Sequence, residues 1–212
     1  MGYRLFFWSI GFCETIGKRL WFVICDGEKY CHLDLKVLGK HNTLNALAAA
    51  GTAWMLGIEP SATEKGLASF GGADRRLQFK GKFNGADIYD DYAHHPDELA
   101  ATIEAVRLLP YKRMIVAFQP HTYTRTHALF DDFVRELKKA DHVVLAEIYA
   151  ARERNTIGIS SMDLVKKISG AHYCETLPQV TEYLSQIAKD GDVILTVGAG
   201  DIYKAGEALL KE

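Results

Sequence analysis

Short apolar runs alternate with helix-type segments from residue 77 to the end of the chain. The expected strands are 86–90, 113–118, 142–146, 171–174 and 193–197, and the expected helices are 96–109, 126–140, 161–169, 177–189 and 202–211. Short strands separated by helices are typical of βαβ units, in which successive strands run parallel. Residues 74–212 are therefore predicted to form one Rossmann-like α/β domain with a mostly parallel sheet.

The first part of the chain has a different pattern. Residues 20–24 and 30–37 are β-rich and flank an Asp-Gly turn, which predicts a hairpin. An Ala-rich helix over 41–57 and a second helix over 60–70 follow. An isolated hairpin is marginally stable in water, so this one is expected to belong to a larger sheet. We therefore expect residues 1–73 to form a separate, partial domain.

The composition of the chain argues against several classes of function. A formal net charge of −2 argues against binding to a nucleic-acid backbone, which normally requires a basic surface. No apolar run reaches the about 18 residues that a membrane span needs, so no membrane partner is expected. The four cysteines have no CxxC spacing, which argues against a zinc site or a redox pair. Reduced thiols in a cytoplasmic protein are the preferred interpretation.

Four polar motifs follow expected strands, at the point where each strand ends. They are Asp90–Pro96, Gln119–His121, Glu147–Tyr149 and Gly198–Asp201. In an open parallel sheet the carboxyl ends of the strands lie along one edge, and ligands bind in the crevice there. The four motifs are therefore predicted to form one shared site.

Each motif has a functional and a purely structural interpretation. Asp90 and Asp91 could accept hydrogen bonds from a ribose or hold Mg²⁺, or they could be acids that favour a helix start. Residues 119–126 place a His, an Arg and four hydroxyl groups at a helix start, where Arg125 could bind a carboxylate. A helix-capping Thr explains one of these residues and not the cluster.

The remaining two motifs are less specific. The loop from Glu147 to Glu153 could contact substrate, and a solvated charged loop is an equal alternative. Gly198 and Gly200 resemble half of a dinucleotide fingerprint without its third glycine, and a close approach of backbone segments would also explain them. The chain contains no GxxxxGK[ST] phosphate-binding loop.

Taken together, these strings resemble the Mur ligases, and within them the branch that adds L-alanine to UDP-N-acetylmuramate. The matching segments are 39–47, 74–76, 90–96, 118–126 and 198–202. The family has a UDP-binding domain, a central ATPase domain with a P-loop and a C-terminal Rossmann-like domain. The resemblance implies that residues 1–73 are the end of the central domain without its P-loop, and that 74–212 are the C-terminal domain. The N-terminal half of such a ligase would then be a possible partner chain, and this chain alone is expected to be inactive.

The resemblance also implies chemistry and residue roles. These ligases use ATP and Mg²⁺ to convert a carboxylate to an acyl phosphate, which the amino group of L-alanine attacks; the metal ligands are expected mainly outside this chain. The implied ATP-binding residues are His41, Asn42, Asn45, Arg76 and Asp91. The implied substrate-binding residues are Tyr92, His94, His121, Arg125 and Tyr149, of which His94, His121 and Arg125 are the catalytic candidates. Relatives often carry Arg where this chain has Thr122.

Two alternatives stay open. The murein tripeptide ligases of cell-wall recycling share the string at Asp90–Pro96, although segment 119–126 follows the alanine-adding pattern. A nucleotide- or amino-acid-binding module without catalysis is the other alternative.

Overall fold

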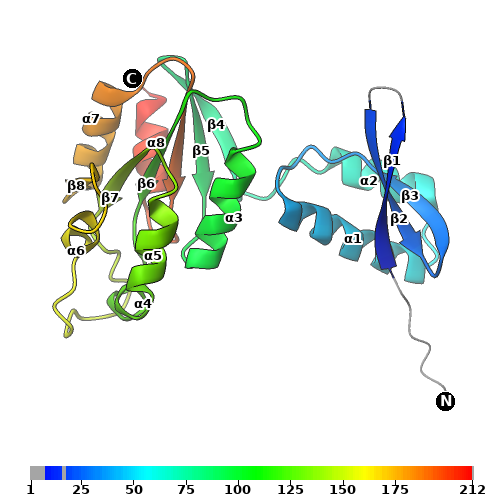
Figure 1. Ribbon diagram of the computed structural model, residues 1–212, viewed down its shortest axis with the longest axis horizontal. Helices are drawn as coiled ribbons and strands as arrows, with labels where there is room; N and C mark the ends of the chain where they lie inside the picture. Colours follow the sequence, from blue (N-terminus) through cyan, green and yellow to red (C-terminus); the bar gives the residue numbers. More distant parts are fainter. Residues whose placement is uncertain (1–7, 16–17, 212) are drawn as a thin grey trace. The chain divides into compact units, whose positions relative to one another are not determined.

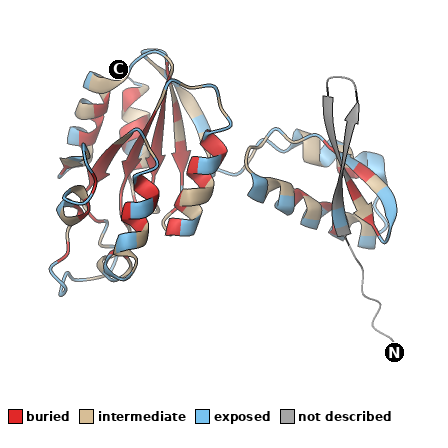
Figure 2. Cartoon of the chain, viewed as in Figure 1, coloured by how far each residue is buried: buried red, intermediate tan, exposed pale blue. Residues whose placement is uncertain are grey.

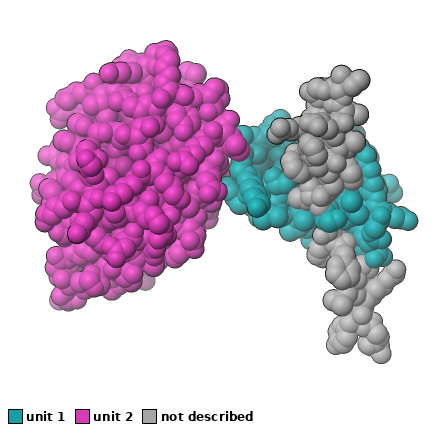
Figure 3. All heavy atoms as spheres, viewed as in Figure 1, with its two compact units in different colours: residues 1–72 teal, residues 73–212 magenta. Residues whose placement is uncertain are grey.

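The computed structural model describes residues 8–15 and 18–211, and the chain divides into two compact units, residues 1–72 and 73–212 (Figures 1 and 3). No described helix is long and apolar enough to cross a membrane.

Unit 1 contains a three-stranded antiparallel sheet and two helices. The elements are β1 (Trp8–Thr15), β2 (Lys18–Cys25), β3 (Glu28–Leu33), α1 (Lys40–Met55) and α2 (Pro60–Ser69). The predicted hairpin is β2–β3, although its second strand ends at Leu33 and not at residue 37. Asp26 and Gly27 both have positive φ, as a two-residue hairpin turn requires. Strand β1 was not predicted, and it supplies the third strand of the sheet.

The core of unit 1 lies between the sheet and α1. Val23, Cys25 and Cys31 are buried against Ala46 and Ala50 of α1, where the small alanine side chains let the helix pack closely on the strands. The hydroxyl of Tyr30 donates to the carbonyl of Ile58 at 2.6 Å and so joins β3 to the segment before α2.

Unit 2 is built on a six-stranded sheet with the order β4-β5-β9-β6-β7-β8 (Figure 1). The strands are β4 (Gln78–Phe83), β5 (Ala86–Asp91), β6 (Arg113–Phe118), β7 (His142–Ala146), β8 (His172–Cys174) and β9 (Asp192–Val197). All neighbours pair in parallel except β4 and β5, which are antiparallel. The prediction of a mostly parallel α/β sheet is confirmed. Edge strand β4 was missed because its sequence, QFKGKF, has few buried positions.

Six helices connect or follow these strands: α3 (Pro96–Val106), α4 (Tyr123–Ala128), α5 (Phe130–Leu137), α6 (Ser161–Val165), α7 (Leu177–Ile187) and α8 (Tyr203–Leu209). The prediction of one continuous helix over 126–140 is wrong. The chain begins its helix at Tyr123 and breaks it at Leu129, where φ is −113° and ψ is 23°. The break lets α4 stay at the strand ends while α5 turns its apolar face toward the sheet.

Two apolar layers cover the sheet, one on each face (Figure 2). Helices α3, α5 and α6 bury Leu99, Phe133 and Leu164 on one face, and α7 and α8 bury Leu184 and Leu209 on the other. The helices that follow β6 and β9 therefore pack on opposite faces, although the two strands are neighbours. Such a reversal opens a crevice at the carboxyl ends of the two strands.

Candidate functional site

The carboxyl edge of the unit 2 sheet brings the four polar motifs together. Along this edge the strands lie in the order β5, β9, β6 and β7, so Asp90–Pro96 is followed by Gly198–Asp201, Gln119–His121 and Glu147–Tyr149. Main-chain bonds link the neighbouring motifs, since the amide of Gly198 donates to Asp91 and the amide of Gln119 donates to Val197. The predicted shared edge is confirmed.

A row of four rings crosses this edge. The ring centroids of Tyr92 and His94 are 5.6 Å apart, those of His94 and His121 are 6.0 Å apart, and those of His121 and Tyr149 are 5.6 Å apart and stacked. Tyr92 and Tyr149 keep 37% and 39% of their surface exposed, so the outer rings of the row can contact a ligand. All four residues were predicted to bind substrate, and the structure places them side by side.

Main-chain bonds hold the second half of this row in place. The amide of Tyr149 donates to the carbonyl of Pro120, and the amide of Thr122 donates to the carbonyl of Tyr149, both at 2.9 Å. The two loops thus form a short parallel bridge at His121 and Tyr149 beyond the ends of β6 and β7.

Arg125 adds a cation to the row. Helix α4 carries it, and its Nη1 lies 3.3 Å from Nδ1 of His121. An arginine only donates hydrogen bonds, so this geometry requires an unprotonated Nδ1 on His121. Burial, the charge of Arg125 and the charge of His94 all lower the pKa of His121 below its ordinary 6.5. His121 is therefore held neutral beside a fixed cation that can bind a carboxylate.

His94 and His95 have different roles although they are adjacent. Nδ1 of His94 lies 3.0 Å from the carbonyl oxygen of Tyr92, which can only accept, so Nδ1 carries the proton. The ring of His95 instead accepts from the amide of Asp97 and caps α3, with Glu98 completing the capping box. The pair of histidines therefore contributes His94 to the ring row and His95 to the helix start.

Asp90 and Asp91 are buried and have internal partners. Asp90 accepts from the hydroxyl of Thr196 at 2.8 Å and from Nε of Arg75 at 3.0 Å. Asp91 accepts from the amides of Leu77 and Ala93 at 2.7 and 2.8 Å. Burial raises the pKa of both carboxyls, against the opposing effect of these hydrogen bonds. Both aspartates connect β5 to its surroundings, and neither forms the start of α3, which His95 caps.

The two glycines after β9 are required by close packing. A Cβ on Gly198 would lie 2.7 Å from the carbonyl oxygen of Gln119, and one on Gly200 would lie 2.3 Å from Oε1 of Gln119. That oxygen accepts from the amides of Asp201 and Ile202, and Nε2 of Gln119 donates to Asp201. Close backbone approach, and not a dinucleotide fingerprint, accounts for this motif.

The loop after β7 is anchored at both ends by glutamates. Glu147 accepts from the hydroxyl of Tyr173 at 2.6 Å, which ties the loop to β8. Glu153 accepts from the amide of Thr124 at 3.0 Å and also from its hydroxyl group, and these bonds lower the pKa of Glu153. The local sequence does not reveal the anchoring role of Glu153, because its partner Thr124 lies 29 positions earlier in the chain. The loop is thus fixed to α4, the helix that carries Arg125.

The five residues predicted to bind ATP fall in both units. His41, Asn42 and Asn45 lie on the first turns of α1 in unit 1, where Asn42 donates to the carbonyl of Leu38 at 2.7 Å. Arg76 lies in unit 2, is exposed, and has its guanidinium 5.9 Å from the ring of Tyr92. Their ATP-binding role stays a prediction, as does that of Asp91.

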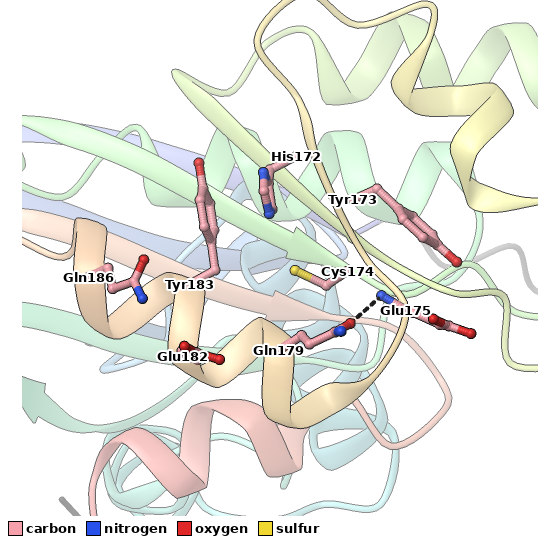
Figure 4. A pocket seen from close by; sticks show the side chains of 8 residues that line it. All are labelled: His172, Tyr173, Cys174, Glu175, Gln179, Glu182, Tyr183 and Gln186. Carbon is pink, nitrogen blue, oxygen red and sulfur yellow. Dashed lines mark hydrogen bonds between the residues drawn. The ribbon is translucent and has the colours of Figure 1, made fainter.

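A separate hollow lies between β8 and α7 (Figure 4). It is lined by His172, Tyr173, Cys174, Glu175, Gln179, Glu182, Tyr183 and Gln186. The rings of His172 and Tyr183 stack at 3.7 Å along one side. The hollow lacks the polar strand-end motifs, so we assign the candidate site to the carboxyl edge. Within the described residues, no group of three or more His, Cys, Asp or Glu side chains could hold a metal ion.

Comparisons with known proteins agree with this geometry. The family model described as "Mur ligase, glutamate ligase domain" matches residues 75–200. The UDP-N-acetylmuramate–L-alanine ligase of Agathobacter rectalis is 48% identical over 190 residues, which cover 88% of this chain and 41% of that protein. The same-named ligase of Lachnospira eligens is 45% identical over 202 residues, which cover 93% of this chain and 44% of that protein.

A solved structure gives the same result. The crystal structure of UDP-N-acetylmuramate-alanine ligase from Thermotoga maritima matches with a TM-score of 0.77 and 28% identity, covering 96% of this chain and 45% of that one. The chain therefore spans less than half the length of the relatives that it matches. The family match extends over most of unit 2, including the carboxyl edge as far as Gly200, and the chain belongs to the Mur ligase family.

Proposed function

We propose that this chain is the C-terminal portion of a UDP-N-acetylmuramate–L-alanine ligase and supplies the side of its active site that receives L-alanine. The observation that carries this proposal is the row of Tyr92, His94, His121 and Tyr149 beside the cation of Arg125. The similarity to ligases of that name over about nine tenths of the chain supports it.

Arg125 and His121 are suited to orient the amino acid. A guanidinium binds a carboxylate through two parallel hydrogen bonds, which would fix the alanine carboxylate beside α4. The pKa of His121 is lowered, so at neutral pH its ring can accept a proton. In this proposal Arg125 holds the carboxylate and His94 lies beside the attacking nitrogen. His121 takes up one of the two protons that the ammonium group loses on forming the amide, and the released phosphate takes up the other. Tyr92 and Tyr149 form walls that favour a small side chain.

The reaction needs groups outside these 212 residues. ATP would transfer its γ-phosphoryl group to the muramate carboxylate, and the alanine nitrogen would then displace phosphate from the acyl phosphate. We propose that residues 1–73 belong to the central ATP-binding domain, with His41, Asn42 and Asn45 at the adenine and Arg76 and Asp91 at the phosphates and ribose. Mg²⁺ would neutralise charge on the phosphates. Because the described residues offer no cluster of three ligands, we place its ligands mainly in the remainder of the ligase.

We propose a cytoplasmic location, because the proposed reaction consumes ATP and a UDP-linked precursor. No part of the proposal requires a membrane or a nucleic acid. The 212-residue chain alone is expected to be inactive, because its sequence has no phosphate-binding loop.

Reconstitution tests this proposal. The chain is joined to the N-terminal portion of a relative such as the Agathobacter rectalis ligase and incubated with ATP, Mg²⁺ and UDP-N-acetylmuramate. We expect phosphate release that depends on L-alanine, with UDP-N-acetylmuramoyl-L-alanine as the product. Release that depends on the murein tripeptide and not on alanine would instead show a recycling ligase. Alanine ligation by the isolated 212-residue chain would contradict the proposal that the reaction needs groups outside these residues.

A further inference from the structure

The side chain of Arg75 makes three hydrogen bonds at the carboxyl edge. Its Nε donates to Asp90 at 3.0 Å, Nη2 donates to the carbonyl of Gly198 at 2.6 Å, and Nη1 donates to the carbonyl of Gly200 at 3.3 Å. One guanidinium therefore spans the end of β5 and the turn that follows β9.

Two aromatic rings lie against the same guanidinium. Its Cζ is 4.8 Å from the centroid of Tyr92 and 4.5 Å from that of Tyr203. A guanidinium over an aromatic face is attracted by the ring's negative surface, and the contact strengthens when the pair is removed from water. Arg75 thus contacts the first ring of the proposed alanine-binding row and also the first residue of α8.

The backbone around Arg75 is shaped to turn this side chain inward. Arg75 and Leu77 have φ values of 56° and 43°, which are costly for residues with a Cβ. Three main-chain groups hold the turn: the amide of Arg75 donates to Gln78, the amide of Leu77 donates to Asp91, and the carbonyl of Arg75 accepts from Tyr92. The turn sends Arg75 into the edge and leaves Arg76 exposed.

We propose that Arg75 is a positioning residue of the alanine-binding edge, which fixes the ring of Tyr92 and the Gly198–Gly200 turn in one arrangement. The expected effect on L-alanine binding rests on the proposed function. The expected effect on the Tyr92 ring and the Gly198–Gly200 turn does not depend on it. Arg75 acts through Tyr92 and the turn, and is distinct from Arg76, the arginine assigned to ATP.

Lysine cannot replace this arginine. An ammonium group is a single point donor, so it cannot bond Asp90 and two separated carbonyls while lying flat against two rings. The variant Arg75→Lys therefore keeps the charge and removes the geometry. Arg135→Lys is the matched control, since Arg135 is a surface arginine on α5 with acidic partners and lies outside the proposed site.

Hydrogen exchange on the 212-residue chain tests whether Arg75 fixes the Gly198–Gly200 turn. In Arg75→Lys we expect the amides of Ala199–Ile202 to exchange about tenfold faster. The loss of one hydrogen bond to a charged group favours local opening of the turn by about this factor. The amides of β6 and β7 keep their rates, and Arg135→Lys changes neither set. If Arg75→Lys fails to fold, Tyr203→Leu removes one ring, keeps the guanidinium, and should accelerate the same amides more weakly. Unchanged exchange over Ala199–Ile202 in a folded variant overturns the proposal.

Steady-state kinetics of the reconstituted ligase test whether Arg75 affects the binding of L-alanine. A positioning role predicts that Arg75→Lys raises KM for L-alanine about tenfold and changes KM for ATP less than about twofold. A loss of active enzyme with both KM values unchanged shows a merely structural role and overturns the proposal. Wild-type enzyme that fails to ligate alanine refutes the proposed function, and hydrogen exchange then still decides whether Arg75 fixes the turn.

Discussion

The two halves of the carboxyl edge use polar residues in opposite ways. At the ends of β5 and β9, Asp90, Asp91 and Arg75 are bonded to each other or to the main chain and are largely buried. Beyond β6 and β7, Arg125 and Tyr149 remain partly exposed and have few internal partners. The difference indicates that the buried residues of the first half fix the shape of the edge. We propose that the second half, together with Tyr92 and His94, contacts the ligand.

Removing a buried charge from the first half should have the largest effect. Asp90→Ala leaves Arg75 without its carboxylate partner, and breaking a pair of this kind costs about 3 kcal/mol. Urea unfolding of the chain measures the loss. Asp97→Ala removes an acid that is 91% exposed and should change stability by less than about 0.5 kcal/mol. Equal losses in the two variants would contradict a structural role for Asp90 in the first half.

Removing the cation of the second half should affect activity and not stability. In the reconstituted ligase, Arg125→Ala should raise KM for L-alanine by roughly thirtyfold, because a charge-assisted carboxylate contact contributes about 2 kcal/mol. Steady-state kinetics with varied alanine measures this change, and thermal unfolding checks that the variant stays folded. A melting temperature that falls as far as in Asp90→Ala would place Arg125 in the structural half.

Gly200 lies where the two halves of the edge meet, and the space around it cannot hold a side chain. Gly200→Ala places a Cβ against Gln119 and 2.8 Å from the ring of Tyr149, so we expect a loss of about 2 kcal/mol in stability. Gly66 lies inside α2 with open space around it, and Gly66→Ala should stabilise the chain by up to about 1 kcal/mol. Urea unfolding measures the change in the free energy of unfolding for both variants. A Gly200→Ala variant as stable as the wild type would contradict the close packing.

Protonation of His121 should give the smallest effect. Its folded-state pKa lies below the 6.5 of the unfolded chain, so its contribution to stability is present above pH 6.5 and is lost as the pH falls through the folded-state pKa. His121→Gln should therefore lose less stability at pH 5 than at pH 7.5, compared with wild type at each pH. NMR titration of the His121 ring measures the pKa directly, and a value above 6.5 would contradict the neutral ring beside Arg125.

The fold was predictable where the sequence pattern is governed by burial alone. The bounds of β6 and β7, residues 113–118 and 142–146, were predicted from their apolar runs because an apolar layer covers each face of these strands. Strand β4 and the break at Leu129 were missed, since an exposed edge strand and a helix break depend on tertiary contacts that a local pattern does not contain.

The candidate site was predictable as a set of residues and not as a set of roles. Strand-end position identified the ring row, because parallel strands place their carboxyl ends together. The inward position of Arg75 could not be read from the sequence, because it depends on two left-handed residues in the turn. Glu153 was missed for a similar reason, since its hydrogen bonds to Thr124 form between two loops.

The most direct test is a crystal structure of the reconstituted ligase with UDP-N-acetylmuramoyl-L-alanine bound. We predict that the alanine carboxylate lies within hydrogen-bonding distance of Arg125, that the alanine methyl group lies beside the ring row, and that the bonds of Arg75 to Asp90 and Gly198 are unchanged. An alanyl group bound elsewhere, for example in the hollow between β8 and α7, would contradict the assignment of the carboxyl edge as the alanine-binding site.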